Sequence, residues 1–261
     1  MEAGGLVEPC SSQFDAMGFS QGGLFLRYYA QYCNAPPIRT LITFGTPHYG
    51  ISALIPCPTP PTVSCLLAAR AARSGIYSSW AQTHLVQAAY FRDPARLDEF
   101  AEINSFVRDL NAEGKYLAGG RTEREEGGMG LRGLERFIAV MFDADRECIL
   151  NFGCPGPPLS AQPPNGVLPS SPTRWRQSRK RPLTSGTVSP AQSAHFWTYS
   201  PENKTELIPL SEQRLYTEDW IGLRHLHETG ALVLDHCPGE HMDLGTGDCA
   251  KRIVEKWVGS K

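Results

Sequence analysis

Long apolar runs are absent from this sequence of 261 residues, and so is a large excess of charge of either sign. No run approaches the roughly 18 apolar residues that a membrane-spanning helix needs, so we expect no transmembrane segment. The formal net charge of -2 lacks the basic excess typical of proteins that bind nucleic acid. Residues 1–12 have neither the basic nor the apolar region of a secretory signal, so we expect no signal peptide in this chain.

Metal-type C-x-x-C spacing is also missing from Cys57 and Cys65, two of the 8 cysteines. These two residues enclose a proline-rich loop that a short disulfide could close, and we predict a disulfide between them. We expect no metal and no cofactor. One glycosylation sequon begins at Asn203, and it carries information only if the protein is exported.

A Gly-x-Ser-x-Gly motif, from Gly18 to Gly22, is the feature around which the remaining sequence is organised. An apolar run that begins at Phe14 enters the motif and a helix-like segment leaves it, which is the strand, turn and helix of a nucleophile elbow. We expect a side chain at either glycine to crowd the strained turn. Ser20 is therefore the candidate nucleophile. The alternative is an ordinary glycine-rich turn.

The run Ile38–Phe44 predicts the next buried strand. A strand, helix and strand in this order indicate a doubly wound α/β fold, in which site residues follow the carboxyl ends of parallel strands. His48 lies in such a loop. Its position does not fit the Ser, acid, His order of α/β-hydrolases, so we interpret it as a pocket or structural residue.

Residues 51–130 have a helical, amphipathic pattern with no sheet strand. The predicted helices lie near Val63–Ser74, Ser78–Phe91 and Leu97–Asn111. Apolar helices inserted between core strands would form a cap over an active site for long acyl chains. Plain crossover helices would give the same periodicity.

The second half contains two further strands. Arg136–Phe142 is followed by two candidate acids, Asp143 and Asp145, where the orienting member of a catalytic triad belongs. Ala231–Asp235 is the predicted last strand, and the candidate base His241 comes after it in a loop that begins with glycine. We interpret His236, which is nearer the strand end, as packed.

Several segments together resemble the palmitoyl-protein thioesterase family of lysosomal hydrolases. The segments that carry the resemblance are Gly18–Gly23, Phe25–Arg27, the Cys57 to Cys65 loop, Leu85–Phe91, Pro209–Leu210, Leu215–Asp219, Gly222–Leu223 and Gly239–His241. The resemblance implies an α/β-hydrolase fold with a catalytic triad of Ser20, Asp145 and His241. It also implies the Cys57–Cys65 pair. Gln21 would supply an oxyanion-hole N–H, as the residue after the nucleophile.

The implied activity is hydrolysis of long-chain acyl thioesters, and the implied substrates are S-palmitoylated proteins or peptides. The implied location is the lysosome or vacuole, or outside the cell. Two alternatives stay open: a lipase-like carboxylester hydrolase, and a non-catalytic remnant that at most binds acyl chains. Family members have sheet strands before the elbow, so we expect a partial domain with the strand before Ser20 at an exposed edge.

Residues 147–187 interrupt the resemblance. This segment is rich in proline, glycine and serine, and it contains a basic run from Arg174 to Arg181. We expect a disordered, dispensable insertion, and we interpret the abrupt return of the pattern after it as translated intron sequence. A basic docking loop is the alternative.

Overall fold

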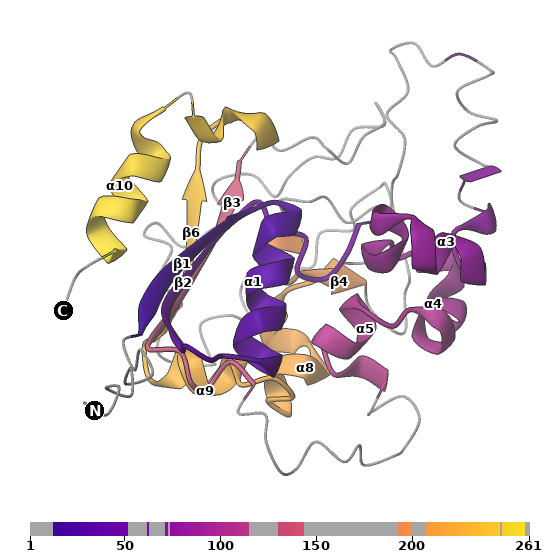
Figure 1. Cartoon of the computed structure of the whole chain (residues 1–261), viewed down its shortest axis with the longest axis horizontal. Coiled ribbons are helices and arrows are strands. Elements are labelled where there is room, and N and C mark those ends of the chain that lie inside the picture. Colours follow the sequence, from indigo (N-terminus) through magenta and orange to yellow (C-terminus); the bar gives the residue numbers. More distant parts are fainter. Residues whose placement is uncertain are drawn as a thin grey trace, which may run out of the picture.

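A parallel β-sheet forms the centre of the molecule in a computed structural model (Figure 1). The structure describes residues 13–51, 62, 71–72, 74–114, 130–143, 193–199, 207–245 and 247–258. The sheet has the strand order β1-β2-β3-β6, with bounds Phe14–Phe19, Ile38–Phe44, Arg136–Phe142 and Leu232–Cys237. The predicted bounds of β2 and β3 are confirmed, whereas β6 extends past the predicted end at Asp235. The predicted α/β class is also confirmed.

All neighbouring strands in this sheet pair in parallel, so their carboxyl ends meet at one edge. At that edge, the first backbone N–H beyond a strand donates to the next strand. Ser20 donates to the carbonyl of Phe44 at 2.7 Å, Gly45 to that of Val140 at 2.8 Å, and Asp143 to that of Cys237 at 2.9 Å. We call these three hydrogen bonds the exit bonds. They fix the strand ends against one another where the loops begin.

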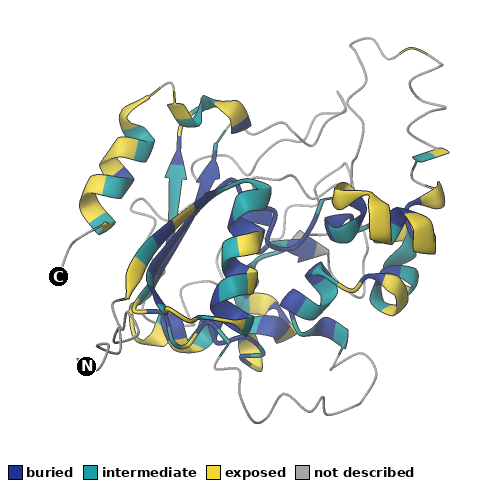
Figure 2. Ribbon diagram, viewed as in Figure 1, coloured by how far each residue is buried: buried dark blue, intermediate teal, exposed yellow. Residues whose placement is uncertain are grey.

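Helices cover both faces of the sheet (Figure 1). One face packs against α1 (Gln21–Tyr32), α8 (Arg214–Thr217) and α9 (Leu223–Glu228), and the opposite face packs against α10 (Asp248–Trp257). The central strands β2 and β3 are accordingly among the most buried elements (Figure 2). In β3, for example, Phe137 and Ala139 face α1 and α9, whereas Ile138 and Val140 face α10. Burial on both faces explains the continuous apolar runs that identified these strands.

A helical segment connects β2 and β3. Its elements are α3 (Ser79–His84), η1 (Val86–Tyr90), η2 (Pro94–Arg96), α4 (Leu97–Ile103) and α5 (Val107–Leu110). Ser78 and Asp93 cap two of these elements by accepting from the backbone N–H of Ala81 and Ala95. The segment shares an apolar cluster with Leu24 of α1, which anchors it to the first helix. In the described part of 51–130, strand-like pairing is limited to one isolated bridge within the segment, between Ile51 and Phe91.

Smaller elements complete the described chain. They are β4 (Thr198–Tyr199), β5 (Leu207–Ile208), η6 (Leu210–Glu212) and η7 (His241–Gly245). β4 and β5 form a separate antiparallel pair. None of the helices that the structure describes is long and apolar enough to cross a bilayer.

β1 is the outermost strand on one side of the sheet. Among the described residues it pairs with β2 alone, and its Met17 is 55% exposed. This placement agrees with the expected edge position of the strand before Ser20.

Candidate active site

Ser20 stands in a sharp turn between β1 and α1. Its backbone has φ 51° and ψ -127°, a conformation that costs energy in any residue with a side chain. A Cβ added at Gly18 would lie 2.6 Å from both the Cα and the N of Gly23, so this position has no room for a side chain. The exit bond to Phe44 holds the turn against β2. The local structure is therefore the strand, strained turn and helix that the motif predicted.

The second glycine of the motif has a different environment from the one expected. A Cβ at Gly22 would meet nothing within 4 Å, so the prediction that a side chain would crowd this position is wrong. The crowded residue is Gly23, where a Cβ would lie 1.9 Å from Oγ1 of Thr46. α1 approaches the loop after β2 at Gly23, and Gly22 points into open space.

His241 lies next to Ser20. Its Nε2 is 2.9 Å from Oγ of Ser20, although the two residues are 221 positions apart in the sequence. For the hydroxyl to donate to Nε2, the ring proton has to be on Nδ1. The residue is 4% exposed, and its ring lies 4.9 Å from that of Phe19 and 6.1 Å from that of Phe142. A buried imidazole in contact with a strained serine can accept the proton of that serine.

Gly45 provides the space for this imidazole. It has φ 56°, and an added Cβ would lie 2.9 Å from both Cε1 and Nδ1 of His241. The sequence analysis missed this role. The available signal was a glycine directly after a buried strand, at the edge where the candidate site was expected.

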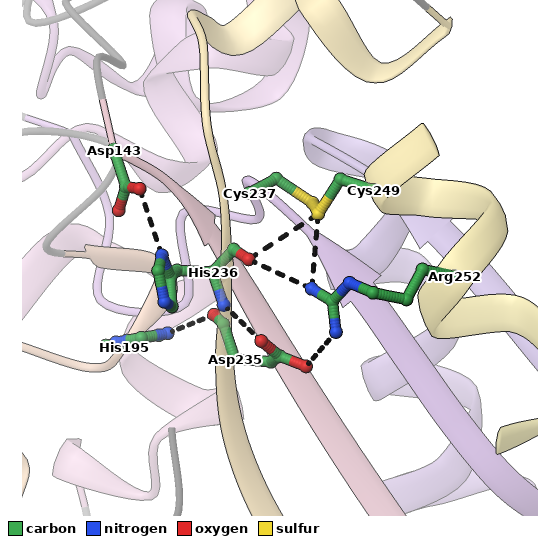
Figure 3. The surroundings of a disulfide bond; sticks show 7 residues. All are labelled: Asp143, His195, Asp235, His236, Cys237, Cys249 and Arg252. Carbon is green, nitrogen blue, oxygen red and sulfur yellow. Dashed lines mark hydrogen bonds and ion pairs between the residues drawn. A yellow bond between two sulfur atoms is a disulfide. The ribbon is translucent and has the colours of Figure 1, made fainter. Parts of the chain in front are cut away.

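The predicted acid Asp145 lies outside the described residues, as do Cys57, Cys65 and Asn203. The competing acid Asp143 is described. Its Oδ2 accepts a hydrogen bond from Nδ1 of His236 at 2.9 Å (Figure 3). The described contact of the Asp143 carboxylate is thus with His236. The interpretation of His236 as packed is wrong, because its side chain is 37% exposed and reaches across to this carboxylate.

The end of β6 has further contacts that the sequence analysis missed (Figure 3). A disulfide joins Cys237 to Cys249 of α10. Arg252, also on α10, contacts Oδ2 of Asp235 and donates to the carbonyl of His236. The signal for the disulfide was weak, since it depends on where α10 packs.

His48 belongs to a buried cluster away from the nucleophile. Its Nε2 is 2.9 Å from Oγ1 of Thr43, and its ring stacks on Phe196 at 4.4 Å. Burial, followed by the charge of Arg27, holds the pKa of His48 well below its usual value. These contacts agree with the interpretation of His48 as a structural residue.

Gln21 and Cys33 have simple positions. Gln21 is the first residue of α1, so its backbone N–H is one of the first-turn amides that have no partner within the helix. Cys33 is exposed and not part of a disulfide.

A metal site would require a group of at least three histidine, cysteine or acidic side chains. The described ranges contain no such group.

Comparison with known proteins gives a consistent family match. The chain matches the family described as palmitoyl protein thioesterase over residues 7–149 and 183–241. The interruption of the match falls within the segment 147–187 that the sequence analysis set apart.

Three relatives illustrate the match. The chain is 40% identical over 142 residues to the palmitoyl-protein thioesterase-dolichyl pyrophosphate phosphatase fusion 1 of Schizosaccharomyces pombe. The aligned region covers 54% of this chain and 22% of the relative. It is 26% identical to palmitoyl-protein thioesterase 1 of Caenorhabditis elegans, over 94% of this chain and 66% of the relative. It is 24% identical to lysosomal thioesterase PPT2-B of Xenopus laevis, over 92% of this chain and 67% of the relative. The chain thus spans about two thirds of the length of the latter two.

Proposed function

The chain belongs to the palmitoyl protein thioesterase family, and from this premise we propose that it is a serine hydrolase that cleaves long-chain acyl thioesters of protein cysteines. The observation that carries the proposal is the contact between His241 Nε2 and the strained Ser20 at 2.9 Å. The proposed triad is Ser20, His241 and Asp145. The names of the relatives from Caenorhabditis elegans and Xenopus laevis support the thioesterase activity.

The proposed reaction has two steps. His241 takes the proton of Ser20 while Oγ attacks the thioester carbonyl, and the cysteine leaves as its thiolate. The imidazolium gives its proton to this thiolate, and the neutral imidazole then takes a proton from a water whose oxygen attacks the acyl-serine. The same proton returns to Oγ of Ser20 as the fatty acid is released. A thiol with a pKa of about 8.5 is a good leaving group, so its protonation contributes less than in amide hydrolysis.

The oxyanion that forms on the carbonyl needs hydrogen-bond donors. The backbone N–H of Gln21, at the start of α1, is the proposed donor next to the nucleophile. The positive end of the helix dipole favours negative charge at this position. Asp145 would hold the Nδ1 proton of His241 and fix its tautomer.

The helical segment between β2 and β3 is the proposed cap for the acyl chain. Its described part has an apolar cluster that includes Phe91, Phe100 and Val107 and is continuous with Leu24 of α1. Each buried CH₂ contributes about 0.8 kcal/mol, so an apolar groove beneath these helices would favour long chains.

A lysosomal or extracellular location is proposed as well. The name of the Xenopus laevis relative supports it, and so does the Cys237–Cys249 disulfide, because disulfides persist in oxidising compartments.

Labelling of Ser20 with a fluorophosphonate tests the function. We expect the label on the peptide that contains Ser20, and loss of labelling and of palmitoyl-thioester hydrolysis in Ser20→Ala. The control Thr217→Ala, which removes an exposed hydroxyl of α8 outside the proposed cap, should lose neither. A label on another residue while Ser20 stays free would refute the assignment. Faster turnover of an oxyester than of the matched thioester would favour a lipase-like hydrolase, and no labelling with no turnover would favour a non-catalytic remnant.

A further inference from the structure

Asp143 and His236 form a hydrogen-bonded pair that the proposed reaction does not use. Asp143 is the first residue after β3, and His236 is the penultimate residue of β6. Nδ1 of His236 donates to Oδ2 of Asp143 at 2.9 Å. Because the acceptor is a carboxylate, the ring proton of His236 is on Nδ1. The pair therefore has a defined geometry, and it joins the exits of two neighbouring strands.

The side-chain hydrogen bond between Asp143 and His236 lies directly beside the last backbone pairings of β3 and β6. Met141 is in register with His236 and Phe142 with Cys237, and the exit bond from Asp143 to Cys237 follows. The side-chain contact adds a second connection between the same two exits. It lies where the backbone ladder ends and the loop to His241 begins.

The backbone of the same residues is held from the other face of the sheet. Cys237 is joined to α10 by the disulfide with Cys249, and Arg252 of α10 donates to the carbonyl of His236 (Figure 3). Nε2 of His195 also contacts the carbonyl of Asp235 at 2.9 Å. The last residues of β6 are therefore held in place by β3, by α10 and by His195.

His241 lies five positions after His236 in the sequence. Its imidazole fits between Phe19 and Phe142 and against Gly45, with Nε2 at 2.9 Å from Ser20. So close a fit leaves little freedom for the loop that carries it. A displacement of about 1 Å in a catalytic group can lower the rate about 10²-fold.

We propose that Asp143 and His236 are positioning residues, which fix the exit of β6 so that the loop from Pro238 brings the imidazole of His241 to Ser20. Neither side chain touches the reacting atoms. The catalytic consequence rests on the proposed function, whereas the positioning of the loop does not. A partly exposed pair of polar side chains contributes little to global stability, so variants of the pair should fold.

The test compares the full chain with the variants Asp143→Asn and His236→Asn, with the double variant, and with the exchanged pair Asp143→His/His236→Asp. The matched control is Glu255→Gln, which removes the exposed pair between Lys251 and Glu255 on α10. Near-UV circular dichroism checks that each variant is folded. Two readouts are used: hydrogen exchange of the backbone amides of 239–245, and kcat and KM for a palmitoyl thioester.

We expect faster exchange of amides 239–245 in both single variants and a kcat about tenfold lower, with KM within about twofold. The double variant should be no worse than the single ones, because the two residues act as a unit. The exchanged pair should recover part of both losses, which a merely local packing role would not produce. Exchange and kcat equal to those of Glu255→Gln would overturn the proposal, as would an undiminished loss in the exchanged pair.

Failure of this inference and failure of the proposed function give different results. If Ser20 is not labelled in the wild-type chain, the proposed function fails and the exchange measurement still decides whether the pair positions the loop. If Ser20 is labelled and turns over substrate while the Asp143 and His236 variants match the control, the positioning role alone fails.

Discussion

Nε2 of His241 lies 2.9 Å from Oγ of Ser20 even though 221 positions separate the two residues. The parallel sheet makes this contact possible, because it places the end of β1 and the loop after β6 at the same edge. β2 and β3 lie between the two strands, so the imidazole has to reach back over the ends of both. The residues at those ends, Gly45 and Phe142, both lie against its ring, as does Phe19 at the end of β1.

The two acids after β3 should differ in their effect on activity. Asp145→Asn is expected to lower kcat about 10⁴-fold, because only the acid bonded to His241 fixes its tautomer. Asp143→Asn is expected to lower kcat about tenfold, since the described contact of Asp143 is with His236. Steady-state kinetics of both variants checks this. A larger loss in Asp143→Asn would mean that Asp143 is the triad acid.

The two glycines of the elbow motif should respond in opposite ways to alanine. Gly18→Ala places a methyl group 2.6 Å from backbone atoms of Gly23, so we expect destabilisation of about 1–3 kcal/mol or more. Gly22→Ala meets open space within a helix and should stabilise the fold by up to about 1 kcal/mol. Urea unfolding of the two variants measures the difference. Equal destabilisation would show that the turn differs from the one described.

Gly45→Ala should affect catalysis more than folding. The left-handed backbone at this position costs alanine about 1–2 kcal/mol, which a folded domain can tolerate. The methyl group would lie 2.9 Å from the ring of His241 and would push it away from Ser20. We expect kcat to fall about 10²-fold with Ser20 still present and the melting temperature only modestly lower. Unchanged kcat would place the imidazole elsewhere in the working enzyme.

The disulfide between Cys237 and Cys249 should be detectable and stabilising. Peptide mapping without reductant should recover the two cysteines in one linked fragment. Their separation of 12 residues makes a loop for which a disulfide contributes about 3 kcal/mol. Cys237→Ala/Cys249→Ala should therefore unfold at lower urea than the oxidised wild type. If reduction leaves the wild-type midpoint unchanged, the bond either does not form or does not constrain the chain.

Stability should fall on acidification, with a contribution from His195. Desolvation lowers the pKa of this residue from 6.5 to about 4 in the folded state. The unfolded chain then binds more protons between these two values, so the stabilisation is complete above pH 6.5 and is lost as the pH falls towards 4. Urea midpoints at pH 7 and pH 4.5 measure the loss. His195→Asn should reduce the pH dependence, and an unchanged dependence would mean that His195 titrates normally.

The fold was predictable where burial leaves a pattern in the sequence. The runs Ile38–Phe44 and Arg136–Phe142 are apolar on both faces, and each is a strand with the predicted bounds. β6 was only partly predicted: the predicted strand ended at the polar Asp235, whereas β6 continues through His236 to Cys237. These polar side chains are tolerated in a strand since Arg252 and Asp143 pair with them, and no local pattern reports such tertiary partners.

The site was predictable to the extent that a motif carries it. The elbow motif and the order of elements singled out Ser20 and His241, and the structure brings both together. The role of Gly45 depends on a histidine nearly two hundred positions away, and the disulfide depends on how α10 packs. Gly22 shows the converse: its place in a motif suggested crowding, whereas the direction of α1 leaves it open.

The exit bonds also bear on where residues can be inserted into the chain or deleted from it. Ser20, Gly45 and Asp143 each complete the pairing of a strand before the following connection begins. An insertion or deletion farther along the connections after β2 and β3, beyond Ile51 and Asp145, would therefore alter mainly the entropy of closing a loop, about 0.6 kcal/mol for each doubling of its length. The strand register, and with it the spacing of Ser20 and His241, would be preserved. Segments grafted into these two connections could thus diversify what the carboxyl ends of the strands accept while the reaction centre is inherited intact.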